Sequence, residues 1–185
     1  MGFVIKNGVL ENYKGNSKNV VIPDGVTTIG YEAFSRCSSR LKSITIPDSV
    51  TSIGRRAFYN CSNLTSITIP DSMTSIGDSV FYGCSRLTSI TIPEGVTTIG
   101  NEAFSNCESL KSITIPDSVT SIGVEAFTQS DKLSDLTLPS ALGAELSRIL
   151  GKNCMPNIHI DDIGNVSAKY RPGCAVGFAE DNRDC

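Results

Sequence analysis

The chain has no tryptophan and a single histidine, His159, within 185 residues. Histidine is the most frequent proton-transfer side chain and the commonest metal ligand, so one isolated copy offers little material for a catalytic or metal site. The sequence also lacks P-loop, GxGxxG, HExxH and GxSxG motifs. We therefore expect a protein that is not an enzyme, uses no cofactor or metal, and carries His159 as a surface residue of its last strand.

The chain has no excess of positive charge. It contains 16 Lys and Arg residues and 19 Asp and Glu residues, which gives a formal net charge of −3. A basic stripe is the footprint of nucleic-acid binding, so nucleic acid is not an expected partner. No run approaches the roughly 18 apolar residues of a membrane-spanning helix, which argues against membrane insertion. Met1 is followed by Gly-Phe-Val-Ile-Lys, which does not resemble a secretory signal.

Most of the chain is one 23-residue unit written repeatedly. The pattern is Leu-x-Ser-Ile-Thr-Ile-Pro-x-x-Val-Thr-x-Ile-Gly-x-x-Ala-Phe-x-x-Cys. It begins at Leu41 and restarts at Leu64, Leu87, Leu110 and, more loosely, Leu133. A fixed period of this length is typical of a solenoid, in which each repeat forms one coil stacked on the next. The sequence thus predicts one elongated body.

Each repeat opens with a segment that fits the leucine-rich-repeat template L-x-x-L-x-L and is rich in β-branched residues, as a strand requires. Strand alternation predicts that Ile67 and Ile69 point inward while Ser66 and Thr68 face solvent. Pro70 ends the strand, because it has no amide hydrogen to donate.

The second half of each repeat predicts a short extended segment with Met73 and Ile76 inward, followed by a bend at Gly77. A single helical or 3₁₀ turn on the convex side then places Phe81 in the core. The predicted fold is a right-handed, β-rich solenoid of leucine-rich-repeat type, with short parallel strands, short helical turns on the convex side and a cap at each end.

Both ends depart from the repeat. We expect an N-terminal β-hairpin cap at 1–16, a leucine-rich repeat solenoid at 17–139, a C-terminal helix-strand cap at 140–160, and a tail or the start of a further segment at 161–185. Asn7-Gly8 is a strong hairpin signal. Ser140 and Gly151 bracket an amphipathic helix, after which Ile158 and Ile160 predict a terminal strand.

Four cysteines recur in register, at Cys37, Cys61, Cys84 and Cys107. Parallel neighbours lie ~4.8 Å apart, so four stacked sulfurs span roughly 14 Å. One zinc ion needs each sulfur at ~2.3 Å, so the four cysteines cannot share a zinc site. Disulfides between coils are less favoured than thiols, because stacked side chains point in parallel. We therefore expect buried, reduced thiols that act as small hydrophobes.

Three further cysteines lie outside this column, at Cys154, Cys174 and Cys185, which makes seven in total. An odd number leaves one thiol unpaired if all others pair within the chain. We expect Cys185 to be exposed and reactive.

The units Leu64-Thr-Ser-Ile-Thr-Ile-Pro-Asp-Ser-Met-Thr-Ser-Ile-Gly-Asp-Ser-Val-Phe-Tyr-Gly-Cys and Leu87-Thr-Ser-Ile-Thr-Ile-Pro-Glu-Gly-Val-Thr-Thr-Ile-Gly-Asn-Glu-Ala-Phe-Ser-Asn-Cys closely resemble BspA-like leucine-rich repeats. The resemblance extends from about Val20 to Pro139. It implies a bacterial protein, extracellular or on the cell surface, that adheres to host or neighbouring-cell proteins; a cytoplasmic location is the alternative. The chain departs from the general template, which has Asn or Cys where Ser49, Ser72, Gly95 and Ser118 stand.

The candidate binding surface consists of the outward residues of the first strand in each repeat. These are Ser43, Thr45, Ser66, Thr68, Ser89, Thr91, Ser112, Thr114, Asp135 and Thr137. The columns carry almost no charge and no aromatic anchor, so neither electrostatic steering nor sugar stacking is predicted. The sequence favours non-catalytic recognition of a protein partner by a monomeric chain.

Three other interpretations of the Ser/Thr columns stay open. Small hydroxyl residues can simply solvate a tight parallel sheet. The solenoid can serve as a structural spacer for a downstream domain. Regular hydroxyl columns at ~4.8 Å spacing also resemble the flat threonine surfaces of ice-binding solenoids.

Overall fold

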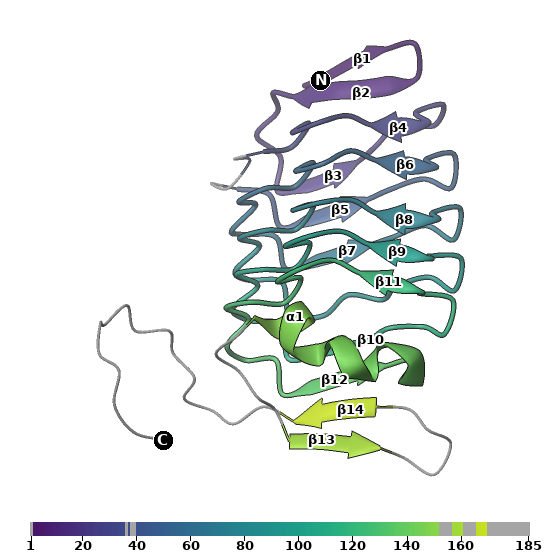
Figure 1. Ribbon diagram of the computed structural model, residues 1–185. Helices are drawn as coiled ribbons and strands as arrows, with labels where there is room; N and C mark the ends of the chain where they lie inside the picture. Colours follow the sequence, from purple (N-terminus) through teal and green to yellow (C-terminus); the bar gives the residue numbers. More distant parts are fainter. Residues whose placement is uncertain (1, 36, 38–39, 152–156, 161–165, 170–185) are drawn as a thin grey trace.

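The structure is a computed structural model that describes residues 2–35, 37, 40–151, 157–160 and 166–169. Its coils stack along one axis, with the N-terminal hairpin at one end and the C-terminal helix and strands at the other (Figure 1). The predicted leucine-rich-repeat solenoid with short parallel strands is confirmed.

Each coil except the last contributes one short segment to each of two rows of strands. The first row contains β3 (Asn19–Val21), β5 (Ser43–Thr45), β7 (Ser66–Thr68), β10 (Ser112–Thr114) and β12 (Asp135–Leu138). The second row contains β4 (Thr28–Ile29), β6 (Ser52–Ile53), β8 (Ser75–Ile76), β9 (Thr98–Ile99) and β11 (Ser121–Ile122). We number the coils 1 to 6 by their first-row segments, with residues 89–91 in coil 4.

Strands within a row pair in parallel and in register, so that Ile44 lies beside Ile67 and Ile76 beside Ile99. Each partner is therefore the equivalent residue of the next repeat. Both rows are interrupted once in the described chain: the first at 89–91, which forms no strand, and the second between β6 and β8.

One apolar core runs the length of the stack. Its centre is a ladder of five phenylalanines, each no more than 1% exposed: Phe34, Phe58, Phe81, Phe104 and Phe127. Neighbouring ring centroids are 5.2 to 5.5 Å apart with nearly parallel planes. The isoleucines of β7 follow the predicted alternation, since Ile67 and Ile69 are buried while Ser66 and Thr68 are exposed.

The convex side is built from hydrogen-bonded turns. In coil 3, for example, the Tyr82 amide donates to the Ser79 carbonyl at 3.2 Å and the Cys84 amide to the Phe81 carbonyl at 3.1 Å, the three-residue spacing of a 3₁₀ turn. These turns do not extend into a helix, because Ser79 has a φ of 52° and the next coil repeats this at Glu102 with 53°. Left-handed backbone interrupts a right-handed helix.

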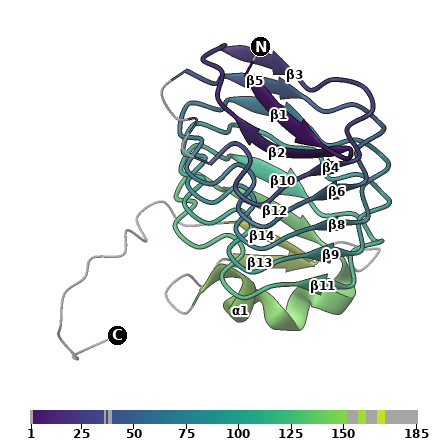
Figure 2. The same cartoon turned by 90° about the horizontal axis from the view of Figure 1, so that it is seen from above.

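The N-terminal end is covered by the antiparallel hairpin of β1 (Phe3–Lys6) and β2 (Val9–Tyr13). Asn7 and Gly8 turn it with φ values of 50° and 76°, as a type I′ turn requires. β2 also pairs in parallel with β4, so the hairpin continues the second row. Seen from this end, the hairpin lies across the coils (Figure 2).

The C-terminal end begins with a 3₁₀ helix, η2 (Ser140–Glu145), that leads into α1 (Leu146–Leu150). Gly151 ends the helix with a φ of 83°. The predicted terminal strand is present as β13 (Asn157–Ile160), but its neighbour is β14 (Val166–Lys169), which lies antiparallel between β12 and β13. Residues 161–185 carry no repeat and were assigned from the sequence to a tail or the start of a further segment, so β14 was not specifically predicted.

Candidate functional site

The structure places all ten predicted binding residues along one face of the first row. Seven of them are exposed and belong to coils 2 to 5, namely Thr45, Ser66, Thr68, Ser89, Thr91, Ser112 and Thr114. Asp135 is also exposed, whereas Ser43 and Thr137 are half-buried at the two ends. Parallel, in-register pairing aligns Ser43 with Ser66 and Ser112 with Asp135. We call these ten residues the Ser/Thr face.

The hydroxyls of this face are mostly unengaged. Ser43 donates to the side chain of Asn19 at 2.9 Å. Within the described chain, the hydroxyls of the other serines and threonines of the face form no hydrogen bond, although the backbones of those in strands take part in the pairing of the coils. Threonines just before the strands behave differently, since Thr65 donates to the Lys42 carbonyl at 3.1 Å and Thr88 to the Thr65 carbonyl at 3.4 Å. The Ser/Thr face therefore presents donors and acceptors that the fold itself does not use.

A second hydroxyl face, overlooked in the sequence analysis, lies on the second row. Its outward residues are Thr28, Ser52, Ser75, Thr98 and Ser121. In the sequence, the recurring Val-Thr-x-Ile motif could have revealed this face. Beside it, Thr97 donates to the Thr74 carbonyl at 3.1 Å and Thr120 to the Thr97 carbonyl at 3.3 Å. The threonines that tie the coils together therefore lie beside this face, as Thr65 and Thr88 lie beside the Ser/Thr face.

Charge borders the Ser/Thr face, although the expectation was of a surface almost without charge. One exposed carboxylate follows the strand-ending proline in each of coils 1 to 5, at Asp24, Asp48, Asp71, Glu94 and Asp117. On the opposite edge, the exposed Lys18, Lys42 and Lys111 precede their strands. Apart from Asp135, the columns themselves are neutral, but the face has an acidic edge and a basic edge. In the sequence, the recurring Pro-Asp and Pro-Glu pairs could have revealed the acidic edge.

The cysteine column consists of free thiols, as predicted. Cys61, Cys84 and Cys107 are buried and Cys37 is half-buried, with no disulfide between them. Burial raises the pKa of Cys61 and Cys84 and lifts that of Cys107 to about 12. Within the described residues no cluster of three metal-binding side chains exists. Cys154, Cys174, Cys185 and the side chain of His159 lie outside the described residues.

These thiols have a role that packing alone did not suggest. The Sγ of Cys61 donates to the Phe34 carbonyl at 3.1 Å, and that of Cys107 to the Phe81 carbonyl at 3.3 Å. Each thiol therefore ties its coil to the phenylalanine backbone of the coil before it. Protonated, buried thiols of this kind are structural rather than nucleophilic.

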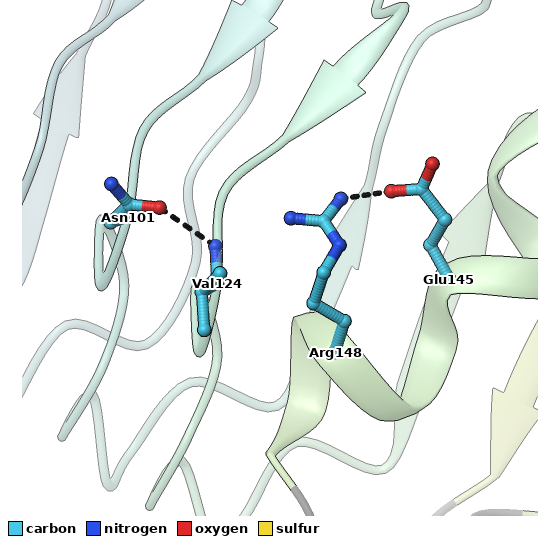
Figure 3. Close-up of polar contacts among 4 residues, drawn as sticks. All are labelled: Asn101, Val124, Glu145 and Arg148. Atoms are coloured by element: carbon cyan, nitrogen blue, oxygen red, sulfur yellow. Dashed lines mark hydrogen bonds and ion pairs between the residues drawn. The ribbon is translucent and has the colours of Figure 1, made fainter.

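The convex edge also has mainly structural contacts. The Asp78 carboxylate accepts from the Asn101 amide at 2.8 Å. The Asn101 side chain in turn accepts from the Val124 amide at 2.8 Å, as Figure 3 shows. Figure 3 also shows Arg148 paired with Glu145 at the start of the cap.

Two tyrosines stack on the same convex side. The rings of Tyr59 and Tyr82 lie 4.9 Å apart, and the Arg56 guanidinium lies 5.2 Å from the centre of the Tyr59 ring. Asn60, Asn106 and Glu108 surround this stack. The arrangement agrees with local packing between adjacent coils.

Comparison with known proteins identifies the repeat. A model of the BspA-type leucine-rich repeat region, present in 6 copies, matches residues 4–134, well over half of the chain. The chain belongs to the BspA-type leucine-rich repeat family. Leucine-rich repeats of this kind are scaffolds with protein-binding or structural roles. None of the curated proteins compared with the chain matches it.

Three solved structures of bacterial leucine-rich repeat proteins are similar to this chain. A leucine-rich repeat protein from Bacteroides ovatus is 40% identical, with a TM-score of 0.66 over 72% of this chain and 37% of that one. A leucine-rich cell surface protein from Faecalibacterium prausnitzii is 39% identical, with a TM-score of 0.68 over 77% of this chain and 38% of that one. The T. pallidum leucine-rich repeat protein is 35% identical, with a TM-score of 0.68 over 71% and 64%. The chain spans less than two thirds of each of these proteins.

No helix in the described part of the chain combines the length and apolarity needed to cross a membrane.

Proposed function

We propose that the chain is a non-catalytic protein-binding module that recognises its partner through the Ser/Thr face. The observation that carries the proposal is the set of exposed hydroxyls that form no internal hydrogen bond, in contrast with the neighbouring Thr65 and Thr88. Unengaged donors and acceptors on a regular surface are available to a partner at no cost to the fold.

The family supports the same proposal. Stacked repeats create long surfaces that bind through many contacts along their length. We infer a cell-surface location and an adhesive role, in keeping with the resemblance to BspA-like proteins and with the F. prausnitzii relative described as a cell surface protein.

A pair of matched double variants tests the proposal. Thr68→Lys with Thr91→Lys introduces two charges at the centre of the Ser/Thr face, where both side chains are exposed. The control, Ser75→Lys with Thr98→Lys, introduces the same charges into exposed positions of the second row, in the same two coils. Circular dichroism should show that both variants keep the wild-type fold.

The immobilised proteins are then presented with extracellular-matrix and cell-surface proteins, and each partner retained by the wild type is purified and measured by direct titration. We expect the Ser/Thr-face variant to lose the partner and the control to keep it. Equal binding by all three proteins would place the partner on another surface. Retention of no partner at all would favour the spacer role.

A further inference from the structure

A hollow of about 360 Å³ opens on the Ser/Thr face between coils 4 and 5. Residues 89–92 and Glu94 form one wall, and Ser112–Thr114 with Pro116 form the other. This volume is near the lower limit for small-molecule pockets, so it suits one side chain better than a large ligand.

The hollow coincides with the interruption in the first row. Residues 89–92 read Ser-Ile-Thr-Ile, the same as 66–69, yet only the latter contribute a strand. In the described chain, the amides of residues 89–92 donate to no backbone carbonyl. The strand sequence is therefore not what sets coil 4 apart from coil 3.

A difference lies just beyond the strand, at Gly95. In three other coils a serine stands here and donates to a valine carbonyl of the preceding coil: Ser49 at 2.8 Å, Ser72 at 2.5 Å and Ser118 at 2.7 Å. Gly95 has no hydroxyl, so coil 4 lacks this tie to coil 3. A Cβ at Gly95 would lie 3.2 Å from the Met73 carbonyl oxygen, within reach of a serine hydroxyl.

The exposed residues of the walls are all polar. Ile90 and Ile92 are only 6% and 4% exposed and Pro116 is buried, whereas Thr91 and Thr114 are exposed and their free hydroxyls supply acceptors. The exposed carboxylate of Glu94 lies on the wall of the hollow. Asp71 and Asp117 occupy the equivalent positions in the neighbouring coils, so the acidic edge runs past the hollow on both sides.

We propose that this hollow receives a cationic side chain, lysine or arginine, from the protein partner. The charged end of such a residue donates to the free hydroxyls of the walls and lies beside the exposed Glu94 carboxylate. Charge complementarity selects this occupant over an acidic or a purely apolar side chain. The inference rests on the proposed function, because it names the chemistry that the same face recognises.

The probe is a short peptide, acetyl-Gly-Ser-Lys-Ser-Gly-amide, titrated into ¹⁵N-labelled protein and followed by NMR. A second peptide carries arginine in place of lysine, and a third carries norleucine, which keeps the stem without the charge. We expect shift changes confined to residues 89–94 and 112–116 for the first two peptides and much weaker changes for the third. Changes spread evenly along the acidic edge, equal binding of norleucine, or no binding would overturn the proposal.

Variants sharpen the test. Glu94→Gln should weaken the binding of the lysine peptide about fivefold, as expected for the loss of one exposed ion pair. The control Asp48→Asn removes a carboxylate of the same edge away from the hollow and should change little. Equal effects of Glu94→Gln and Asp48→Asn would show that only general electrostatics acts.

This titration needs no natural partner, so its failure is distinct from failure of the proposed function. If the Ser/Thr-face variant loses a natural partner but the lysine peptide does not locate the hollow, only the present inference is wrong. If the peptide locates the hollow but no partner depends on the face, the inference stands and the proposed function is wrong.

Discussion

The hydroxyl of Ser130 donates a hydrogen bond to the carbonyl oxygen of Phe104, 2.8 Å away, at the position where the preceding coils use a cysteine thiol. Cys84 forms the equivalent bond to Phe58 at 3.4 Å. The last full coil thus replaces sulfur with oxygen and keeps the contact. What this position requires is a small, buried hydrogen-bond donor, and the redox chemistry of a thiol is not needed.

Cys84→Ser should therefore change the free energy of unfolding little. Cys84→Ala removes both the donor and some buried volume, so we expect it to cost about 1 to 2 kcal/mol more than the serine variant. Urea unfolding followed by circular dichroism measures both. If serine proves as destabilising as alanine, the hydrogen bond contributes nothing.

Phe81→Ala should destabilise the protein by about 3–5 kcal/mol, because it leaves a cavity within the aromatic ladder. The Phe81 ring stacks against both Phe58 and Phe104, whereas among the described residues Phe127 stacks against Phe104 alone. Phe127→Ala should cost less, as thermal denaturation can determine. Negligible effects at both positions would mean that these rings do not support the core.

Gly123→Ala should be destabilising by about 1–3 kcal/mol, since overpacking forces neighbouring atoms to move. A Cβ at Gly123 would lie 2.3 Å from the backbone nitrogen of Asn101 in the preceding coil. Gly77 offers a matched control, because a Cβ there would meet nothing closer than 3.5 Å. Melting temperatures of Gly123→Ala and Gly77→Ala should differ clearly; similar values would contradict the close approach of the coils.

Stability should fall at alkaline pH. The unperturbed thiol pKa is 9.0, and burial raises that of Cys107 to about 12, so the folded protein holds this proton more tightly than the unfolded chain. The resulting stability is fully present below pH 9.0 and is lost as the pH rises towards 12. The expected slope is at most about 1.4 kcal/mol per pH unit for each thiol.

Urea titrations between pH 8 and pH 11 measure this slope. Other groups titrate in the same range, so the variant with Cys61, Cys84 and Cys107 all changed to Ser serves as the reference. The wild type should lose stability more steeply than this variant. Parallel curves would show that the thiols do not contribute to the pH dependence.

Much of the fold followed from the sequence, because strand alternation and the 23-residue period act within or between identical units. The inward Ile67, the outward Thr68 and the buried Phe81 all lie where those two periods predict. β14 (Val166–Lys169) was not predicted because it carries no repeat. Its place between β12 and β13 depends on contacts with a completed cap.

The candidate site was less predictable. The ten columnar residues could be assigned to one face, but their hydrogen bonding depends on distances between coils that no single repeat encodes. The hollow shows this most clearly, since 89–92 has the same four residues as 66–69 and yet a different backbone environment. Only the comparison of Gly95 with Ser72 across coils connects the sequence to that difference.

In-register pairing has an evolutionary consequence. Because paired strands and stacked rings place a residue against its own counterpart, duplicating one unit, such as residues 64–86, inserts a coil whose new contacts copy existing ones. Gene duplication can therefore lengthen the molecule without inventing new packing. Each added copy would extend the Ser/Thr face by one serine and one threonine and its acidic edge by one carboxylate, so the reach of the protein can be tuned in whole units.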